Sequence, residues 1–189
     1  MRRHPRLVVV GLLLALLGLV AGCGGNPKPE TLPSPTPSPS SSATATAGPS
    51  PPVLPAAAKA RSLAGARAFA RHYISLINYA QATGRVDSLS AVEAAGCKSC
   101  ASSERYLSDL YAGGGTITGG DFKITGITTV PNPATEGWLV EIGVEFGPQL
   151  VDHPAPKTDE HPKGGRLPLN VQVAWQDDGW RVLEWTRGA

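Results

Sequence analysis

The chain has 189 residues, of which 22 Gly and 18 Pro make up about a fifth, well above the usual share of these two residues. Ten of the prolines lie between Pro27 and Pro55, so we divide the chain into a leader (1–22), a Pro/Ser/Thr tether that starts with Cys23 (23–55) and one folded domain (56–189). A domain of that length can build a single core. Without the three arginines of the leader, the chain has 14 Lys and Arg and 15 Asp and Glu, so its net charge is close to zero. No basic cluster favours a nucleic-acid partner.

The leader has the three parts of a secretion signal: a basic start, an apolar run from Leu7 to Val20, and small residues before a cysteine. The apolar run is shorter than the roughly 20 residues that a membrane-spanning helix needs. Its last residues, Val20-Ala21-Gly22-Cys23, resemble the bacterial lipobox. That resemblance implies that a diacylglyceryl group, with acyl chains such as palmitate, is attached to the sulfur of Cys23 before a dedicated peptidase cleaves in front of this residue. The alternative is an ordinary secretory leader with a chance cysteine.

The lipid on Cys23 would anchor the protein to the outer side of the cell membrane, because two acyl chains give stable binding. The tether that follows holds 10 Pro and 10 Ser or Thr between Gly24 and Pro55. Such a composition cannot bury enough apolar surface to fold, so we expect a disordered, semi-rigid spacer. O-glycosylation or recognition of the tether as a Pro-rich ligand are the alternatives.

The first half of the domain has helical periodicity. Apolar residues recur at intervals of three and four residues over 56–83, which predicts a first helix. Gly84 is the residue at which we expect this helix to end. Ser90 and Glu93 have the spacing of a capping box, which predicts a short second helix from Ser88 or Ser90 to Gly96. A third helix is expected over 99–112, before the glycine run 113–115.

After the glycine run the period changes to two, which predicts strands at 121–130, 138–146, 171–176 and 180–185. Asp177-Asp178-Gly179 predicts a tight hairpin between the last two. We therefore expect an α+β domain, with N-terminal helices packed on one face of a curved antiparallel sheet of three to four or more strands.

The element order and the closing Asp178-Gly179-Trp180-Arg181-Val182 resemble the cone-shaped domains of the nuclear transport factor 2-like superfamily. The lipobox, the tether, Phe69, the segments 78–80 and 83–84, the Cys97-Lys98-Ser99-Cys100 motif and Tyr111 before glycines together resemble a family of uncharacterised actinobacterial putative lipoproteins. That family is defined by a domain of unknown function, so the resemblance implies a location and a fold but no activity.

Cys97 and Cys100 form the one CxxC motif of the chain. Two cysteines this close usually pair in an oxidising compartment, so we expect a structural disulfide between the second and third helices. Redox catalysis and metal binding are the alternatives, but the strand context of a thioredoxin motif is absent, and zinc would need two further ligands.

A second polar cluster, Asp152, His153, Asp159, Glu160 and His161, lies in what we expect to be a proline-stiffened loop of about 20 residues. Two imidazoles with carboxylates are a candidate metal or acid–base set, with Asp152, His153, Asp159 and His161 as the candidate ligands. Their spacing fits no known metal motif, so we favour a solvated hairpin loop.

His72 and Tyr73 lie on the first helix, whose inner face would line a pocket between helices and sheet, which makes them candidate ligand-pocket residues; a surface or core role is the alternative for His72. Trp138, Trp175, Trp180 and Trp185 could form a platform for sugars. Their period-two placement favours the core, with Trp180 and Trp185 expected on opposite faces of their strand.

The sequence contains no phosphate-binding loop, nucleophile elbow or HExxH motif. We therefore expect a non-catalytic binding domain without a cofactor, whose partner is another envelope protein or a cell-wall component, in addition to the membrane lipid. The alternative is an enzyme that uses the pocket between the helices and the sheet, which would need at least two titratable groups within reach of each other.

Overall fold

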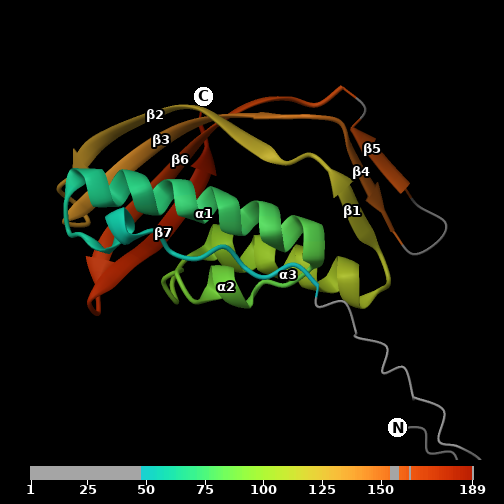
Figure 1. The fold of residues 1–189 in the computed structure, drawn as a ribbon, viewed down its shortest axis with the longest axis horizontal. Helices are drawn as coiled ribbons and strands as arrows, with labels where there is room; N and C mark the ends of the chain where they lie inside the picture. Colours follow the sequence, from blue (N-terminus) through green and yellow to red (C-terminus); the bar gives the residue numbers. More distant parts are fainter. Residues whose placement is uncertain (1–47, 154–157, 162, 189) are drawn as a thin grey trace, which may run out of the picture. The chain divides into compact units, whose positions relative to one another are not determined.

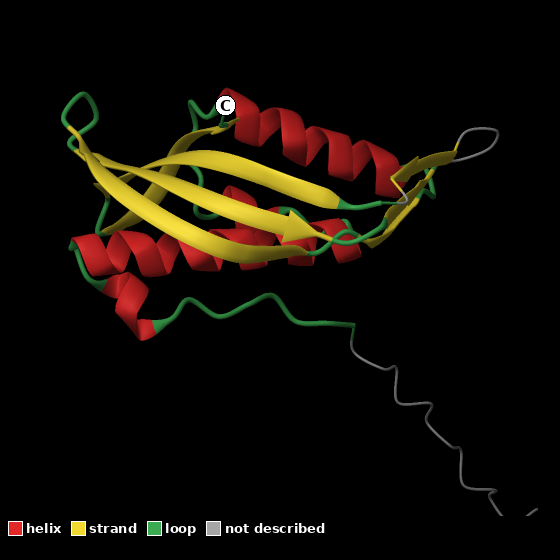
Figure 2. Ribbon diagram, turned by 90° about the horizontal axis from the view of Figure 1, so that it is seen from above, coloured by secondary structure: helices red, strands yellow, loops and turns green. Residues whose placement is uncertain are grey.

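The computed structural model describes residues 48–153, the backbone of 158–161, and residues 163–188. The leader and most of the tether lie outside this part of the chain. The described domain has a short 3₁₀ helix, three α-helices and two antiparallel sheets, and the larger sheet arches over the helices (Figure 1). Seen from above, the long strands lie across the helical layer (Figure 2). This is the α+β architecture with helices on one face of a curved sheet that the sequence predicts.

The first predicted helix is two helices in the structure. A short 3₁₀ helix η1 (Ala56–Lys59) is followed by a break, and α1 (Leu63–Thr83) then begins at the N-cap Ser62, whose hydroxyl accepts from the Gly65 amide at 3.1 Å. The break has a tertiary cause: the Ala60 carbonyl leaves the helical pattern to accept the indole N–H of Trp180 at 3.1 Å. Helix α1 ends at Gly84 (φ 70°), as predicted.

The second helix is much shorter than predicted. Helix α2 (Asp87–Ser90) ends where the capping box was expected to begin a helix, so that interpretation of Ser90 and Glu93 is wrong. The chain after Ser90 instead lies along strand β7 (Gly179–Arg187), with hydrogen bonds from the Ala94 amide to the Val182 carbonyl and from the Val182 amide to the Val92 carbonyl. The edge strand β7 supplies these two backbone hydrogen bonds in place of further helical turns. Helix α3 (Lys98–Ala112) agrees with the prediction.

The larger sheet has the strand order β2-β3-β6-β7, with every neighbouring pair antiparallel. Its four strands correspond to the four predicted ones, with some ends shifted: β2 (Phe122–Asn132), β3 (Gly137–Phe146), β6 (Gly165–Gln176) and β7. Asp177 and Asp178 both have positive φ in the tight β6–β7 hairpin, as expected. The inner face of this sheet packs on α1 and carries the core valines and isoleucines.

A second sheet, of order β1-β4-β5, was not predicted. Strand β1 (Thr116–Gly119) follows the glycine run, and β4 (Gln149–Asp152) pairs both with it and with β5 (Thr158–His161). The long loop predicted after Phe146 is therefore partly a hairpin. These strands have only four residues each, too few to show a clear alternation.

The prediction that Trp180 and Trp185 lie on opposite faces of their strand is wrong. The register between β6 and β7 shifts between Gln172 and Val173, which leaves Leu183 as the extra residue of a β-bulge. Beyond the bulge the alternation is reversed, so Trp185 lies opposite Val171 on the inner face, the same face as Trp180.

The folded unit starts earlier than residue 56. Leu54 is partly buried and packs against the core, although the neighbouring Val53 is exposed. Among the residues that the structure describes, no helix is long and apolar enough to cross a membrane.

Candidate functional site

A cavity of about 660 Å³ lies between the helices and the inner face of the sheets. This volume is within the usual range for small-molecule sites. Helix α1 supplies Tyr73 and Ile77, helix α3 supplies Leu107, and the strands supply aromatic and aliphatic side chains such as Phe122 and Trp185. Ser102, Tyr106 and Arg187 are lining residues that are also exposed, so the opening lies where α3 and the end of β7 diverge.

The polar centre of the cavity is a hydrogen bond between Tyr73 and Glu93. The Tyr73 hydroxyl, whose side chain is 1 % exposed, donates to Glu93 Oε1 at 2.6 Å. Glu93 reaches this position because its backbone is bridged to Val182 on the edge of the sheet. Burial, together with the charge of Glu93, raises the pKa of Tyr73 above its ordinary value, so the hydroxyl stays a proton donor.

A second carboxyl lies beside the first. Glu104 on α3 hydrogen-bonds with Glu93. It also accepts a hydrogen bond from the Ser90 hydroxyl at 2.5 Å. Burial is the largest of the causes that raise the pKa of Glu93 to about 7. The hydrogen bond from Tyr73 comes next in size and acts in the opposite direction, and the hydrogen bond and charge of Glu104 add to the rise. The neighbouring charge of Glu104 therefore favours the protonated form of Glu93.

One further polar group in the wall has no partner. Gln81 lines the cavity, and its side-chain oxygen Oε1 is buried without a hydrogen-bond partner among the described residues. An unpaired buried acceptor costs about 1 to 3 kcal/mol. A ligand with a hydrogen-bond donor would remove this cost.

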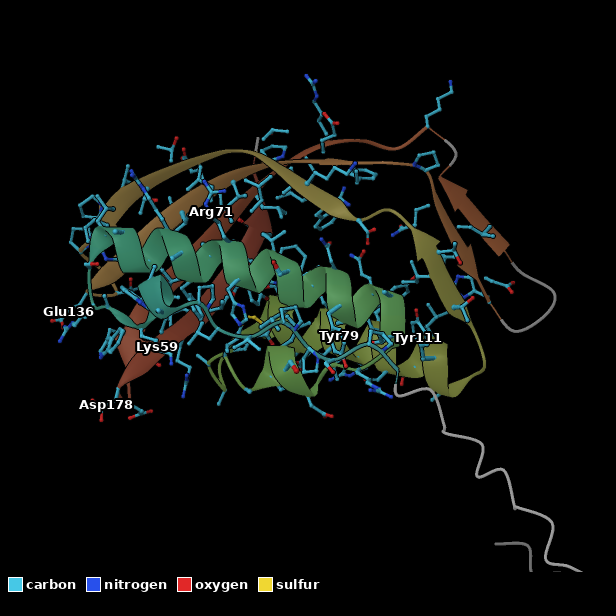
Figure 3. The ribbon with its side chains drawn as sticks, viewed as in Figure 1. Lys59, Arg71, Tyr79, Tyr111, Glu136 and Asp178 are labelled. Carbon is cyan, nitrogen blue, oxygen red and sulfur yellow. A yellow bond between two sulfur atoms is a disulfide. The ribbon has the colours of Figure 1, made fainter. Side chains whose placement is uncertain are left out.

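The side chains of Asn78 and Tyr111 form hydrogen bonds that join the walls of the cavity. The Asn78 side chain accepts from the Phe122 amide at 2.9 Å and donates to the Phe122 carbonyl at 3.0 Å, which fixes the start of β2 against α1. The Tyr111 hydroxyl donates to the Gln81 carbonyl and accepts from the Ile117 amide at 3.2 Å. Tyr79 and Tyr111 lie at the same end of the helical layer (Figure 3).

The two candidate pocket residues of α1 have different places. Tyr73 lines the cavity, as the sequence predicts, but His72 does not. One helical step turns a side chain by about 100°, so neighbours on α1 cannot share one narrow face. His72 is buried, and this burial lowers its pKa below the ordinary value.

The structure joins Cys97 and Cys100 by a disulfide at the start of α3, as drawn in Figure 3. Both residues are buried, and Cys97 is the N-cap of α3, where its sulfur accepts from the Cys100 amide at 3.3 Å. A buried disulfide that caps a helix serves to fix the α2–α3 connection.

The candidate metal set falls partly outside the described residues, since the side chains of Asp159 and His161 are not described. The backbone does place both residues on β5, opposite Val151 and Gln149 of β4. Within the described part of the chain, no group of three or more His, Cys, Asp or Glu side chains could hold a metal ion. The metal hypothesis for Asp152, His153, Asp159 and His161 therefore remains a prediction.

Sequence reasoning missed Glu93, Glu104 and Gln81. Glu93 was assigned to a capping box, and Glu104 and Gln81 have the spacing of ordinary helix-surface residues. The partners of Glu93 and Glu104 are distant in sequence or belong to another element, and no local pattern encodes such a meeting. The one available signal was the placement of Tyr73 on the inner stripe of α1.

The comparisons with known proteins concern the family and the fold. A family model described as a family of unknown function (DUF6318) matches residues 39–186. The chain belongs to this family. The DUF6318 match begins before the predicted start of the domain and ends within β7, and it agrees with the expectation of a domain of unknown function.

No curated protein matches the chain. One solved structure similar to this DUF6318 chain is the crystal structure of the intermembrane space region of chloroplast protein ARC6, at a TM-score of 0.47 and 19% sequence identity. The match covers 66% of this chain and 96% of that chain.

Proposed function

We propose that this protein is an extracytoplasmic lipoprotein whose folded domain binds a small amphipathic molecule in the cavity between helices and sheet, without converting it. The observation that carries the binding function is the cavity itself: apolar walls, a few convergent polar groups, and an unpaired buried acceptor on Gln81. The anchoring part rests on the Val20-Ala21-Gly22-Cys23 motif and on the Pro/Ser/Thr tether.

The proposal extends to the fold family and to the source. Three helices followed by a curved antiparallel sheet, with a cavity between them, support a cone-shaped fold of the nuclear transport factor 2-like type. The lipobox and tether support membership of an actinobacterial lipoprotein group. Another envelope protein or a cell-wall component remains the alternative partner, bound on the surface of the domain.

Fluorescence titration of the purified protein with the neutral apolar dye Nile red tests the binding function. We expect saturable binding of one dye molecule per chain. Ser103→Trp, which adds a large side chain to the cavity wall, should weaken binding at least tenfold, since a filled cavity has no room for the dye. The matched control Ser75→Trp, on the exposed face of α1, should bind as wild type does. Equal binding by both variants would exclude the cavity as the site.

Acid–base catalysis is the second candidate function, because one observation favours it. Glu93 has a pKa of about 7 and hydrogen-bonds to Tyr73, so two titratable groups lie within reach of each other. In a hydrolase screen of the purified protein, turnover that is lost in Glu93→Gln while Nile red still binds would favour the enzyme. Binding without turnover favours the binding protein.

A further inference from the structure

The carboxyl pair Glu93–Glu104 is held by neutral donors alone. From α1 the Tyr73 hydroxyl donates to Glu93, and from the end of α2 the Ser90 hydroxyl donates to Glu104. No Lys, Arg or His in the described part of the chain forms an ion pair with either carboxyl. Partly buried carboxyls without a cation are costly, so this end of the cavity favours an incoming positive charge.

The remaining hydrogen-bonding capacity of the cavity also favours a donor. An ionised carboxylate accepts about four hydrogen bonds, and one hydroxyl donor to each leaves room for more. Gln81 Oε1 is a further buried acceptor without a partner among the described residues, but it lies eight residues beyond Tyr73 on α1, roughly 12 Å along the helix, so it is available to a second donor of the ligand and not to the same ammonium group. An ammonium group brings both a positive charge and up to three N–H donors.

The charges that line the cavity differ along β7, because Arg187 lies on the same strand as the residue beside Glu93. Glu93 lies beside Val182, and the exposed Arg187 lies five residues further along β7, roughly 15 Å at the usual rise of a strand. Glu93 and Arg187 therefore join the cavity wall at different points along β7, and Trp185 lines the cavity between these points of the strand. A ligand's cationic head is attracted to the carboxyl end and repelled from the Arg187 end.

We propose that the cavity takes an organic amine, with its ammonium group at Glu93, which lines the cavity and has Glu104 beside it, and with its apolar body along the aromatic and aliphatic walls. This inference rests on the proposed binding function. It adds to that function the chemical class of the ligand and the residues that select it.

Three probes of equal chain length test the selectivity: octylammonium, 1-octanol and octanoate, titrated into the purified protein near pH 8 by calorimetry. We expect octylammonium to bind about tenfold or more tightly than 1-octanol, since a hydrogen bond to a charged group contributes about 1.5 to 3 kcal/mol. Octanoate should bind more weakly than 1-octanol.

Two variants identify the residues responsible. Glu93→Gln should reduce the preference for octylammonium over 1-octanol to within about twofold, and Glu104→Gln should lower it in the same direction. Glu141→Gln is the matched control, because it removes one negative charge from the exposed outer face of β3 and should keep the full preference.

The outcomes separate the two proposals. Equal binding of the three probes to wild type, or a preference that survives in both Glu93→Gln and Glu104→Gln, would overturn the amine proposal and leave the binding function standing. Failure of all three probes, together with Nile red, would overturn both.

Discussion

The Tyr73 side chain is buried in the cavity wall, and a buried hydroxyl is costly unless it is hydrogen-bonded. Glu93 supplies its acceptor at 2.6 Å. The same contact brings a carboxyl into a poorly solvated place, so its protonation is coupled to folding.

Stability should therefore depend on pH through Glu93. The pKa of this carboxyl is about 7 in the folded protein against an ordinary 4.5, so the folded state binds the proton more tightly than the unfolded chain. The free energy of unfolding should fall as pH rises from 4.5 to about 7 and be constant above that as far as this group is concerned. We expect a loss of about 1 to 2 kcal/mol, because partial exposure to water reduces the full effect.

Urea denaturation at about pH 5 and about pH 8 measures this loss. Glu93→Gln cannot titrate and should show a smaller difference between the two pH values, whereas Glu141→Gln should follow wild type. The same pH dependence in wild type and Glu93→Gln would contradict the assignment.

At the scale of the elements, two irregular features create the cavity's polar and aromatic lining. The chain after α2 leaves the helix to pair with the β7 edge, which carries Glu93 inward. The bulge at Leu183 reverses the alternation of β7, which brings Trp185 to the same face as Trp180. A regular helix and a regular strand would have removed both side chains from the cavity.

The Cys97–Cys100 disulfide fixes the connection between α2 and α3. Because the closed loop is very short, we expect the double variant Cys97→Ala/Cys100→Ala to lose only about 1 to 2 kcal/mol of unfolding free energy. Urea denaturation measures the loss, and thiol counting on the native exported protein should find neither cysteine free.

The control for this prediction is the wild-type protein in reductant, which should approach the stability of the double variant. Two titratable thiols in the native protein, or a reduced form as stable as the oxidised one, would argue against a structural disulfide.

At the scale of the whole molecule, the proposal places a ligand-binding domain at the end of a spacer on the membrane surface. Cys23→Ser tests the anchor, because the thiol of Cys23 is the proposed site of attachment of the diacylglyceryl group. The variant should remain unlipidated and uncleaved by the lipoprotein-specific peptidase. Metabolic labelling with a fatty-acid analogue, followed by membrane fractionation, measures both effects.

Wild type processed in parallel is the reference for the labelling experiment, and Cys97→Ala/Cys100→Ala is the control for loss of an unrelated cysteine. Label on the Cys23→Ser variant as strong as on wild type would rule out Cys23 as the anchor.

The sequence by itself determined the elements whose signals are local. The stripe on α1, the stop at Gly84, the helix 98–112, the four long strands and the Asp177-Asp178 hairpin follow from periodicity and turn chemistry, which depend on residues within a few positions of each other. The α+β class follows from their order.

The tertiary structure alone decided the break at Ala60, the end of α2 at Ser90, the strands β1, β4 and β5, and the bulge at Leu183. In each case a contact with a distant segment outweighs a weak local preference: the Trp180 indole holds the Ala60 carbonyl, and the β7 edge holds the chain at Val92 and Ala94. The candidate site belongs to this second group. Tyr73, Glu93 and Glu104 come from three segments that meet only after folding, so no spacing in the sequence could have brought them together.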